Sequence, residues 1–432
     1  MNSQAQELNE VLAGASPVLP TFLSQRAQAM YFPYKGILGQ SAQAKGVKYN
    51  ATIGIACEDD LSPMRLSSLD ELHNLGPKEA YPYAPSFGHP ELRKTWKSMI
   101  AQKNPGLTGK NFSTPVVAQA LTHGITLSAM MFLDPGDEIL VPDPYWDNYN
   151  LLFEESLGAK VATFPCFEGE NFNLKGLEDA LGARKGQKVN LLLNFPNNPT
   201  GYTPMADEMD AISALLKKSA DEGTKLVVFI DDAYFGLVYE EGVATESIFS
   251  QLTDLHPNLL AVKIDGATKE DYAWGFRVGF ITFGHPEATE EAYKALNDKL
   301  GGFIRGTISN CSMLSQSMLL KAYTDKNYAS QKEEKYQTLK GRYDVLKNEL
   351  QNHPEYAESF STLPYNSGYF MCIQPTQGVD AESVRRLLIE KFDTGLIALS
   401  GLLRIAFSSA PSQSIPTILS NVHKAIQEVK DA

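Results

Sequence analysis

Two basic side chains at a fixed spacing could carry chemistry together. Lys269 lies in the segment 267–270, Ala-Thr-Lys-Glu, and Arg277 follows eight residues later in Trp-Gly-Phe-Arg-Val-Gly. A lysine amine can form a Schiff base with a carbonyl compound, and a guanidinium can bind a phosphate with two hydrogen bonds. The pair alone is a weak signal, because most lysines and arginines lie on protein surfaces.

Two further polar clusters follow apolar runs upstream of Lys269. Asn198 lies in the segment 194–201, Asn-Phe-Pro-Asn-Asn-Pro-Thr-Gly, and Asp231 and Tyr234 lie in Asp-Asp-Ala-Tyr. A lysine for a Schiff base, an acid for a pyridinium and an arginine for a phosphate match the needs of pyridoxal phosphate. The sequence therefore predicts that these residues form one site for this cofactor.

The elements that must position these residues alternate in the middle of the chain. Apolar runs predict buried strands at 115–121, 138–141, 189–194, 225–230, 259–264 and 278–283. Helical patterns lie between most of them, including 125–133, 174–181, 208–220 and 287–299. This alternation predicts an α/β fold with a mainly parallel sheet covered by helices on both faces, three layers in all. Ligands of such sheets gather at the carboxyl ends of strands, where the polar clusters fall.

Changes of pattern divide the chain into three predicted segments. We expect residues 66–315 to form a large cofactor-binding domain and residues 316–432 a small α+β domain, with residues 1–65 packing on the small domain. A charged, helical stretch at 315–353 would connect the two domains. The small domain is predicted to hold strands at 369–373 and 402–407 and a final helix at 415–429.

Composition and charge exclude several classes of function. The chain has 432 residues, and its net charge of −13 argues against nucleic acid or acidic membrane surfaces as partners. The four cysteines are scattered without a metal-type pair, so we expect free thiols and no metal site. No apolar run approaches the ~20 residues that span a bilayer, and no signal-like segment opens the chain. We therefore expect a cytoplasmic protein.

Taken together, these motifs resemble the fold-type I pyridoxal-phosphate-dependent aminotransferases of the class I/II, aspartate aminotransferase-like, family. The resemblance implies that Lys269 forms the Schiff base and moves the α-proton of the substrate. It implies that Asp231 faces the pyridine nitrogen and that Tyr234 and Asn198 hydrogen-bond the phenolic oxygen of the ring. Asn198 would also reach the substrate carboxylate. Asp232 is the competing acid, although the spacing to the tyrosine favours Asp231.

The resemblance also implies ligands for the rest of the cofactor. Arg277 would bind the phosphate, and so would Thr122-His123-Gly124, as a loop that opens a helix. Trp146 would stack on the ring, with Tyr145 as the alternative. Tyr83 would reach the phosphate of a neighbouring subunit, which implies a homodimer with shared active sites.

One phosphate ligand departs from the pattern of the family. The family often has a serine three residues before the lysine, and Gly266 stands there in this chain. The neighbouring Thr268 is a candidate replacement.

Two arginines are expected to bind the substrate. Arg404, inside the apolar run 402–407, would hold the α-carboxylate, because a lone arginine is rarely buried without a partner. Arg305 would bind a side-chain carboxylate across the dimer; an exposed arginine at the start of a helix is the alternative. The resemblance implies transfer of an amino group from an amino acid to a 2-oxo acid by a ping-pong mechanism, with a preference for dicarboxylic amino acids. A lyase or decarboxylase on the same fold, or a non-catalytic regulator that binds the cofactor, are the alternatives.

Overall fold

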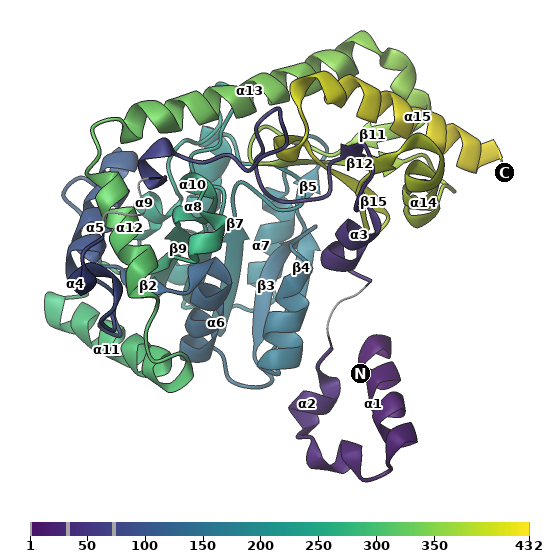
Figure 1. Ribbon diagram of the computed structural model, residues 1–432. Helices are drawn as coiled ribbons and strands as arrows, with labels where there is room; N and C mark the ends of the chain where they lie inside the picture. Colours follow the sequence, from purple (N-terminus) through teal and green to yellow (C-terminus); the bar gives the residue numbers. More distant parts are fainter. Residues whose placement is uncertain (1, 32–34, 71–74, 432) are drawn as a thin grey trace.

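A twisted sheet between helices forms the centre of the molecule (Figure 1). The computed structural model describes residues 2–31, 35–70 and 75–431. These residues form a seven-stranded sheet of order β2-β10-β9-β8-β7-β3-β4. The strands are β2 (Val116–Ala118), β3 (Glu138–Asp143), β4 (Lys160–Pro165), β7 (Lys188–Asn194), β8 (Lys225–Asp231), β9 (Leu259–Gly266) and β10 (Gly279–Gly284).

The sheet is mainly parallel, as the sequence predicts. Only β10 runs antiparallel to its neighbours, β9 and β2, and the other neighbouring pairs are parallel. The predicted strand at 115–121 is shorter, because the chain turns into a helix at Ala120. Strand β4 was not predicted. It lies at the edge of the sheet and lacks a continuous buried run, so its sequence has no clear strand pattern.

Helices cover both faces of this sheet, which confirms the predicted α/β class. The main ones are α5 (Pro90–Lys103), α6 (Ala120–Phe132), α7 (Leu174–Gly182), α8 (Ala206–Asp221) and α11 (Glu290–Thr307). Helix α6 packs on one face, where Gly124 meets Ile264 of β9. Helix α5 covers the opposite face, where Trp96 hydrogen-bonds Asp265 of the same strand and stacks on Phe280. Successive residues of β9 thus face opposite layers, as the period of a strand requires.

A second, antiparallel sheet lies toward the C-terminus. Its order is β11-β12-β15-β14, with β11 (Phe360–Thr362), β12 (Phe370–Pro375), β14 (Ile397–Leu399) and β15 (Leu402–Ala406). Helices α14 (Ala381–Phe392) and α15 (Ile415–Asp431) pack together beside it. The expected connector at 315–353 is two helices, α12 (Met313–Tyr323) and α13 (Tyr328–Asn352), and α13 runs along the top of Figure 1.

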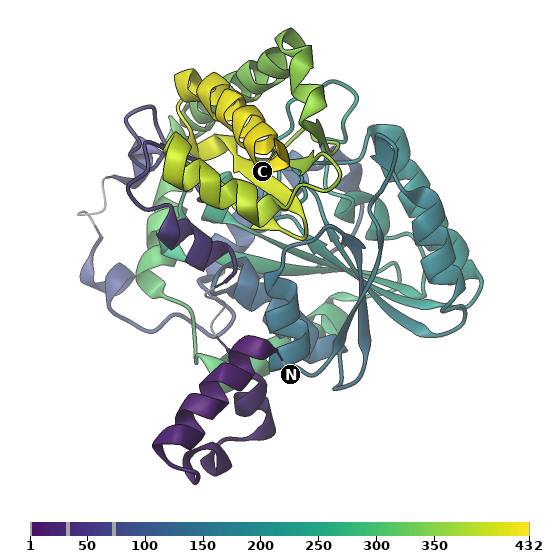
Figure 2. The same cartoon turned by 90° about the vertical axis from the view of Figure 1, so that its right-hand side faces the viewer.

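The N-terminal residues divide between two places. Helices α1 (Ser3–Ala15) and α2 (Gln25–Ala29) contact each other and project from the body in both views (Figures 1 and 2). Helix α3 (Ile37–Gln43) and strand β1 (Tyr49–Asn50) lie with the second sheet, because β1 pairs with β13 (Thr394–Gly395) and Gln40 exchanges two hydrogen bonds with Ala398. The domain limits at residues 65 and 315 stay a prediction.

Short elements complete the fold. They are α4 (Pro77–Ala80), α9 (Phe249–Leu252), α10 (Ala267–Glu270), β5 (Phe167–Glu168), β6 (Asn171–Phe172) and a π-helix at Asn150–Ser156. Among the described residues, no helix has the length and apolar character that crossing a membrane requires.

Candidate active site

A cavity of about 170 Å³ lies at the carboxyl ends of the central strands. Seven predicted site residues line it: Thr122, Trp146, Asn198, Asp231, Tyr234, Lys269 and Arg404. The rest of the lining is mostly apolar and comes from Ile37, Gly54, Leu121, Ile125, Asn194, Ala233 and Phe370. Elements far apart in the sequence therefore bring an amine, a carboxylate and a guanidinium to one small space.

Asp231 ends strand β8 and is 3% exposed. Its carboxylate accepts hydrogen bonds from the Tyr149 hydroxyl at 2.5 Å and from the Ala233 N–H at 3.2 Å. Burial raises the pKa of Asp231, while the Tyr149 hydroxyl and the nearby Lys269 ammonium oppose that rise. A buried carboxylate without an ion-pair partner is suited to face a cationic group of a ligand.

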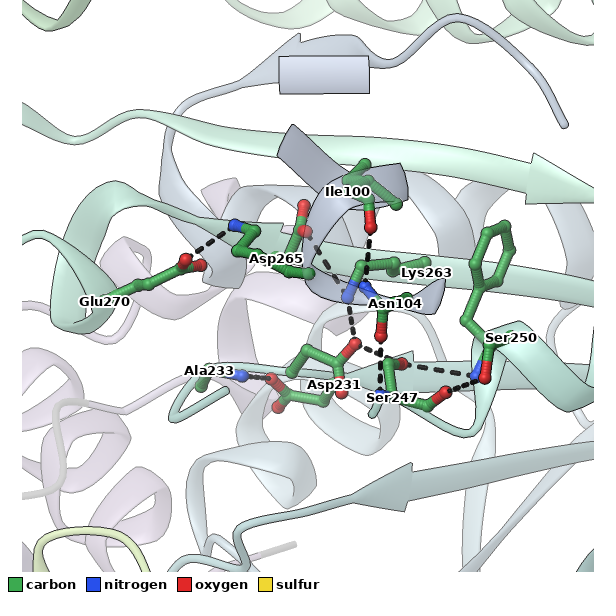
Figure 3. A network of polar contacts seen from close by, with 12 residues as sticks. Ile100, Asn104, Asp231, Ala233, Ser247, Ser250, Lys263, Asp265 and Glu270 are labelled. Carbon is green, nitrogen blue, oxygen red and sulfur yellow. Dashed lines mark hydrogen bonds and ion pairs between the residues drawn. The ribbon is translucent and has the colours of Figure 1, made fainter. Parts of the chain in front are cut away.

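The next residue, Asp232, faces the opposite side of the sheet. Its carboxylate accepts a hydrogen bond from the Ser247 hydroxyl at 2.6 Å and pairs with the buried ammonium of Lys263. Lys263 also pairs with Asp265 at 3.3 Å (Figure 3). The strand period thus places Asp231 in the cavity and Asp232 in an ion cluster behind it.

Lys269 follows β9 in the single-turn helix α10. Its Nζ lies 4.9 Å from the centre of the Tyr234 ring. Burial lowers the pKa of Lys269 to about 8; the charge of Arg277 also lowers it and that of Asp231 opposes the shift. A lysine with a lowered pKa has more neutral amine near pH 7, which is the form that attacks a carbonyl carbon.

A free hydroxyl lies next to this lysine. Thr268 is 3% exposed, and its Oγ1 has no hydrogen-bond partner within the described part of the chain. At Gly266, a Cβ atom would lie 2.6 Å from the Val278 carbonyl oxygen, so a serine would not fit there without a backbone shift. A buried hydroxyl without a partner costs about 1–3 kcal/mol, so Thr268 is suited to bind a ligand that Gly266 cannot reach.

Helix α6 begins two residues before the predicted phosphate loop, Thr122-His123-Gly124. Ala120 opens the helix with φ 61°, and Leu121 and Thr122 line the cavity. His123 Nδ1 accepts the Gln119 N–H at 3.1 Å. Gly124 packs on Ile264, where a Cβ would meet the Ile264 side chain at 2.8 Å. Of the predicted loop, only Thr122 lines the cavity, and the free amides of the first helical turn lie at Ala120–Thr122.

Arg404 enters the cavity from β15. It is 2% exposed, and its Nη1 donates to the Asn198 side-chain oxygen at 3.0 Å and Nη2 to the Thr52 carbonyl at 3.2 Å. Its guanidinium lies 4.2 Å over the Phe370 ring, and its Nε has no partner among the described residues. A buried guanidinium that meets neutral acceptors only is suited to bind an anion.

Two aromatic residues support the cavity from the segment after β3. Trp146 lines the cavity, whereas the Tyr145 hydroxyl donates to the Asn150 side chain at 2.8 Å. Tyr149 packs edge-to-face on Trp146 at 5.4 Å and orients Asp231. Sequence reasoning missed Tyr149, although it lies three residues after Trp146, a spacing that places side chains on one helical face.

Besides His123 and Gly124, three predicted residues do not line the cavity of a single chain. Arg277 is exposed in a left-handed conformation, φ 54°, and donates to the Trp274 carbonyl at 3.5 Å. Tyr83 is 89% exposed. Arg305 is exposed on α11 and donates to the Ser309 hydroxyl at 2.5 Å. The charge of Arg277 is close enough to lower the pKa of Lys269. Within the described residues, neither Tyr83 nor Arg305 lines the cavity.

Comparison with known proteins agrees with this fold. A solved aminotransferase of Anaerococcus prevotii superposes with a TM-score of 0.81 at 23% identity, covering 93% of this chain and 98% of that one. An aspartate aminotransferase of Thermus thermophilus with maleate superposes with a TM-score of 0.72 at 20% identity. At such identities the likeness shows a shared fold, that of the pyridoxal-phosphate transferases of fold type I.

Sequence relatives then define the family. The profile of aminotransferase class I and II matches residues 74–421, so the chain belongs to this family and is an aminotransferase. The probable aspartate/prephenate aminotransferase of Aquifex aeolicus is 25% identical over 361 residues, 80% of this chain and 84% of that protein. The probable N-acetyl-LL-diaminopimelate aminotransferase of Bacillus subtilis is 26% identical over 243 residues, and the match spans 56% of its length.

Proposed function

We propose that the chain binds pyridoxal phosphate in this cavity and transfers the amino group of an amino acid to a 2-oxo acid. The observation that carries the proposal is the convergence of Lys269, Asp231 and Arg404 on one cavity, each without an opposite charge at ion-pair distance within the described residues. The unpartnered Thr268 hydroxyl and the free amides at the start of α6 suit the phosphate.

The same residues divide the work of the reaction. Bound pyridoxal phosphate supplies a carbonyl carbon for amines and a ring that accepts the electrons of a broken bond at Cα. Asp231, oriented by Tyr149, stabilises a positive charge on the ring nitrogen, and Trp146 offers the ring an aromatic face. Arg404 binds the α-carboxylate, and Lys269 moves the proton at Cα.

We propose that Tyr234 and Asn198 bind the phenolic oxygen of the ring. Both are buried and line the cavity. Burial raises the pKa of Tyr234, although the Arg404 charge opposes the shift, so its hydroxyl keeps a proton to donate. Arg277 would add a positive charge at the phosphate. Its side chain would first turn away from the Trp274 carbonyl, to which it donates a hydrogen bond.

We further propose a homodimer in which Tyr83 and Arg305 complete the cavity of the partner. Their exposure in a single chain is what such a role requires, because each must reach a second copy. Mixed dimers of Tyr83→Phe and Lys269→Ala subunits should regain some activity, since one site of each hybrid keeps both wild-type residues. A monomer with full activity would contradict the arrangement.

Arg305 would then select dicarboxylic amino acids such as aspartate or glutamate. A buried guanidinium discriminates against an uncharged side chain, which would leave it unpaired. The ratio of kcat/KM for aspartate to that for phenylalanine should fall in Arg305→Leu. Equal slowing of both substrates would show that Arg305 does not select them.

All four cysteines are buried free thiols, which suits the cytoplasm as the proposed location.

The direct test of the proposed function is a half-reaction screen. Cofactor-loaded protein is mixed with single amino acids, and the cofactor absorbance and the released 2-oxo acid are followed. A transaminase should change its spectrum, release the matching 2-oxo acid, and return to the first spectrum when a 2-oxo acid is added. Release of ammonia or carbon dioxide without this reversal would support a lyase or a decarboxylase in its place.

A further inference from the structure

We infer that four charged side chains behind the cavity position Lys269 relative to the sheet that carries Arg404. We call Lys103, Glu270, Asp271 and Lys332 the ionic clamp. The inference rests on the proposed function of Lys269. None of the four side chains lines the cavity. Glu270 and Asp271 directly follow Lys269 in the sequence, whereas Lys103 and Lys332 lie far from it.

The clamp begins at the two residues after Lys269. Glu270 is 6% exposed and Asp271 is fully buried. The Glu270 Oε1 atom accepts Lys103 Nζ at 2.5 Å and Lys332 Nζ at 3.1 Å. Lys332 Nζ also pairs with Asp271 Oδ1 at 3.1 Å. Figure 3 shows Glu270 beside the ion cluster of Asp265 and Lys263.

Two tyrosines complete the contacts of Asp271. Its carboxylate accepts the Tyr323 hydroxyl at 2.8 Å and the Tyr328 hydroxyl at 2.6 Å. Tyr323 ends α12, whereas Tyr328 and Lys332 lie in the first turns of α13. The clamp and these tyrosines therefore fix the junction of α12 and α13 to Glu270 and Asp271, the two residues that follow Lys269.

Helix α13 carries this connection to the second sheet. Its Arg342 is fully buried and donates to the Ser408 carbonyl at 2.5 Å, two residues beyond the end of β15. Arg404 lies in β15 itself. A second contact joins Lys269 to this sheet more directly, because the Tyr369 hydroxyl, next to β12, donates to the Lys269 carbonyl at 3.3 Å. Lys269 and the sheet that carries Arg404 are thus connected through the protein, and the proposed substrate would contact both side chains.

Lys269 needs support of this kind because of its local structure. The hydrogen bonds of the sheet end with β9 at Gly266, and α10 is one turn of helix. A single turn forms poorly alone, because nucleation fixes several residues for few hydrogen bonds. Contacts of the side chains that flank Lys269 must therefore hold its backbone, and the clamp supplies them.

Glu270 keeps its negative charge at working pH. Burial alone would raise the pKa of Glu270, but the ammonium groups of Lys103 and Lys332 lower it to about 2. Removal of one partner from a buried ion pair is costly because it leaves the other charge unpaired. An exposed pair on the same helix differs: Lys340 and Asp344 are 35% and 48% exposed, and such pairs contribute little.

The test compares Lys332→Met with Lys340→Met, the same substitution on the same helix. The readouts are kcat and KM for the amino donor and, in cofactor-free protein, the pKa of Lys269 from the pH dependence of its labelling by an amine reagent. In Lys332→Met, kcat should fall by about tenfold or more, since small displacements of reacting groups have effects of this order, and the Lys269 pKa should rise from about 8. Lys340→Met should match wild type in both, and Lys332→Arg should recover part of kcat.

Two outcomes would overturn the inference. The first is a Lys332→Met protein with lower thermal stability but wild-type kcat and Lys269 pKa, which would assign the clamp to stability alone. If Lys332→Met does not fold, Tyr323→Phe/Tyr328→Phe removes two hydrogen bonds from Asp271 and keeps every charge. An unchanged kcat and Lys269 pKa in that variant is the second outcome. A wild-type protein without transaminase activity would contradict the proposed function, whereas the labelling result would still test the clamp.

Discussion

Asp231 and Asp232 are neighbours in the chain and belong to two different regions. Asp231 faces the cavity with Lys269 and Arg404, and within the described residues none of the three takes part in an ion pair. Asp232 faces the layer behind, where Lys263 pairs with both Asp232 and Asp265. Both regions contain lysine and aspartate side chains, and Asp231 and Asp232 are 3% and 4% exposed.

The difference lies in the partners. Within the described residues, the three charged side chains of the cavity form no ion pair, and the Thr268 hydroxyl beside Lys269 has no hydrogen-bond partner. A ligand that supplies these partners therefore gains free energy. In the region behind, the Lys263 ammonium pairs with the carboxylates of Asp232 and Asp265. These pairs connect the ends of β8 and β9, and the three side chains keep no unpaired charge for a ligand. Burial of a charged residue therefore does not identify a site, whereas burial without a partner does.

Two lysines give the largest expected contrast. Lys269→Ala should lower turnover by more than ~10²–10⁴-fold, because it removes both the nucleophile and the proton carrier, and should leave stability nearly unchanged. Lys263→Met should lower the free energy of unfolding by about 3–5 kcal/mol, because Asp232 and Asp265 lose their cation. Turnover of folded protein and urea unfolding measure the two effects. The reverse assignment, with turnover lost in the Lys263 variant alone, would remove the distinction between the regions.

The two aspartates should repeat this contrast at a smaller scale. Asp231→Asn should lower turnover on the order of 10²-fold, because an amide does not stabilise a positive charge on the ring nitrogen. Asp232→Asn should lower the free energy of unfolding by about 1–3 kcal/mol and keep most turnover. Steady-state rates and denaturant unfolding of both variants test this prediction, and greater loss of turnover in Asp232→Asn would mean that the wrong acid was assigned.

The pH dependence of Lys269 sharpens the comparison. Its pKa is lowered, so the neutral amine is the major form above about pH 8, and protonation takes over as the pH falls through that value. An exposed lysine has a pKa of ~10.4 and is mostly protonated over the same range. Labelling of cofactor-free protein with an amine reagent, read by mass spectrometry across pH, should give a midpoint near 8. In Asp231→Asn the midpoint should shift lower, since the Asp231 charge favours the ammonium form; a wild-type midpoint near 10 would contradict the lowered pKa.

The smallest expected effect concerns the start of α6. Ala120 has φ 61°, a conformation that a glycine adopts without strain. Ala120→Gly should raise the free energy of unfolding by up to about 1 kcal/mol, because relief of strain exceeds the added flexibility of the unfolded chain. Ala129→Gly, inside the same helix, should lower it by about the same amount. Destabilisation by both substitutions would show that Ala120 is not strained.

The sequence predicts the core of the fold well because buried strands are continuous apolar runs. Strands β7, β8 and β9 appear close to their predicted ranges, whereas the edge strand β4 lacks such a run. The break between α12 and α13 was not predicted, because the residues between them, 324–327, lie within a charged stretch without a proline or glycine.

The sequence predicts candidate site residues that lie in short motifs. It does not predict contacts between residues that are far apart in the chain. Lys269 and Asp231 lie in compact motifs, and alternation along β8 separates Asp231 from Asp232. The predicted phosphate loop, 122–124, begins two residues after the start of α6, because the helix opens at Ala120, a residue type that rarely adopts its backbone conformation. Its role at the phosphate stays a prediction. Lys103 and Lys332 contact Glu270 from separate parts of the chain, so no local sequence pattern predicts these contacts.

The central claim is that Lys269 is the lysine that bonds to the cofactor. Purified protein is incubated with pyridoxal phosphate, reduced with borohydride and digested, and the modified peptide is identified by mass spectrometry. We expect one pyridoxyl group per chain, on Lys269, and none in Lys269→Ala. A pyridoxyl group on Lys263 or any other lysine at full occupancy, with Lys269 unmodified, would contradict it.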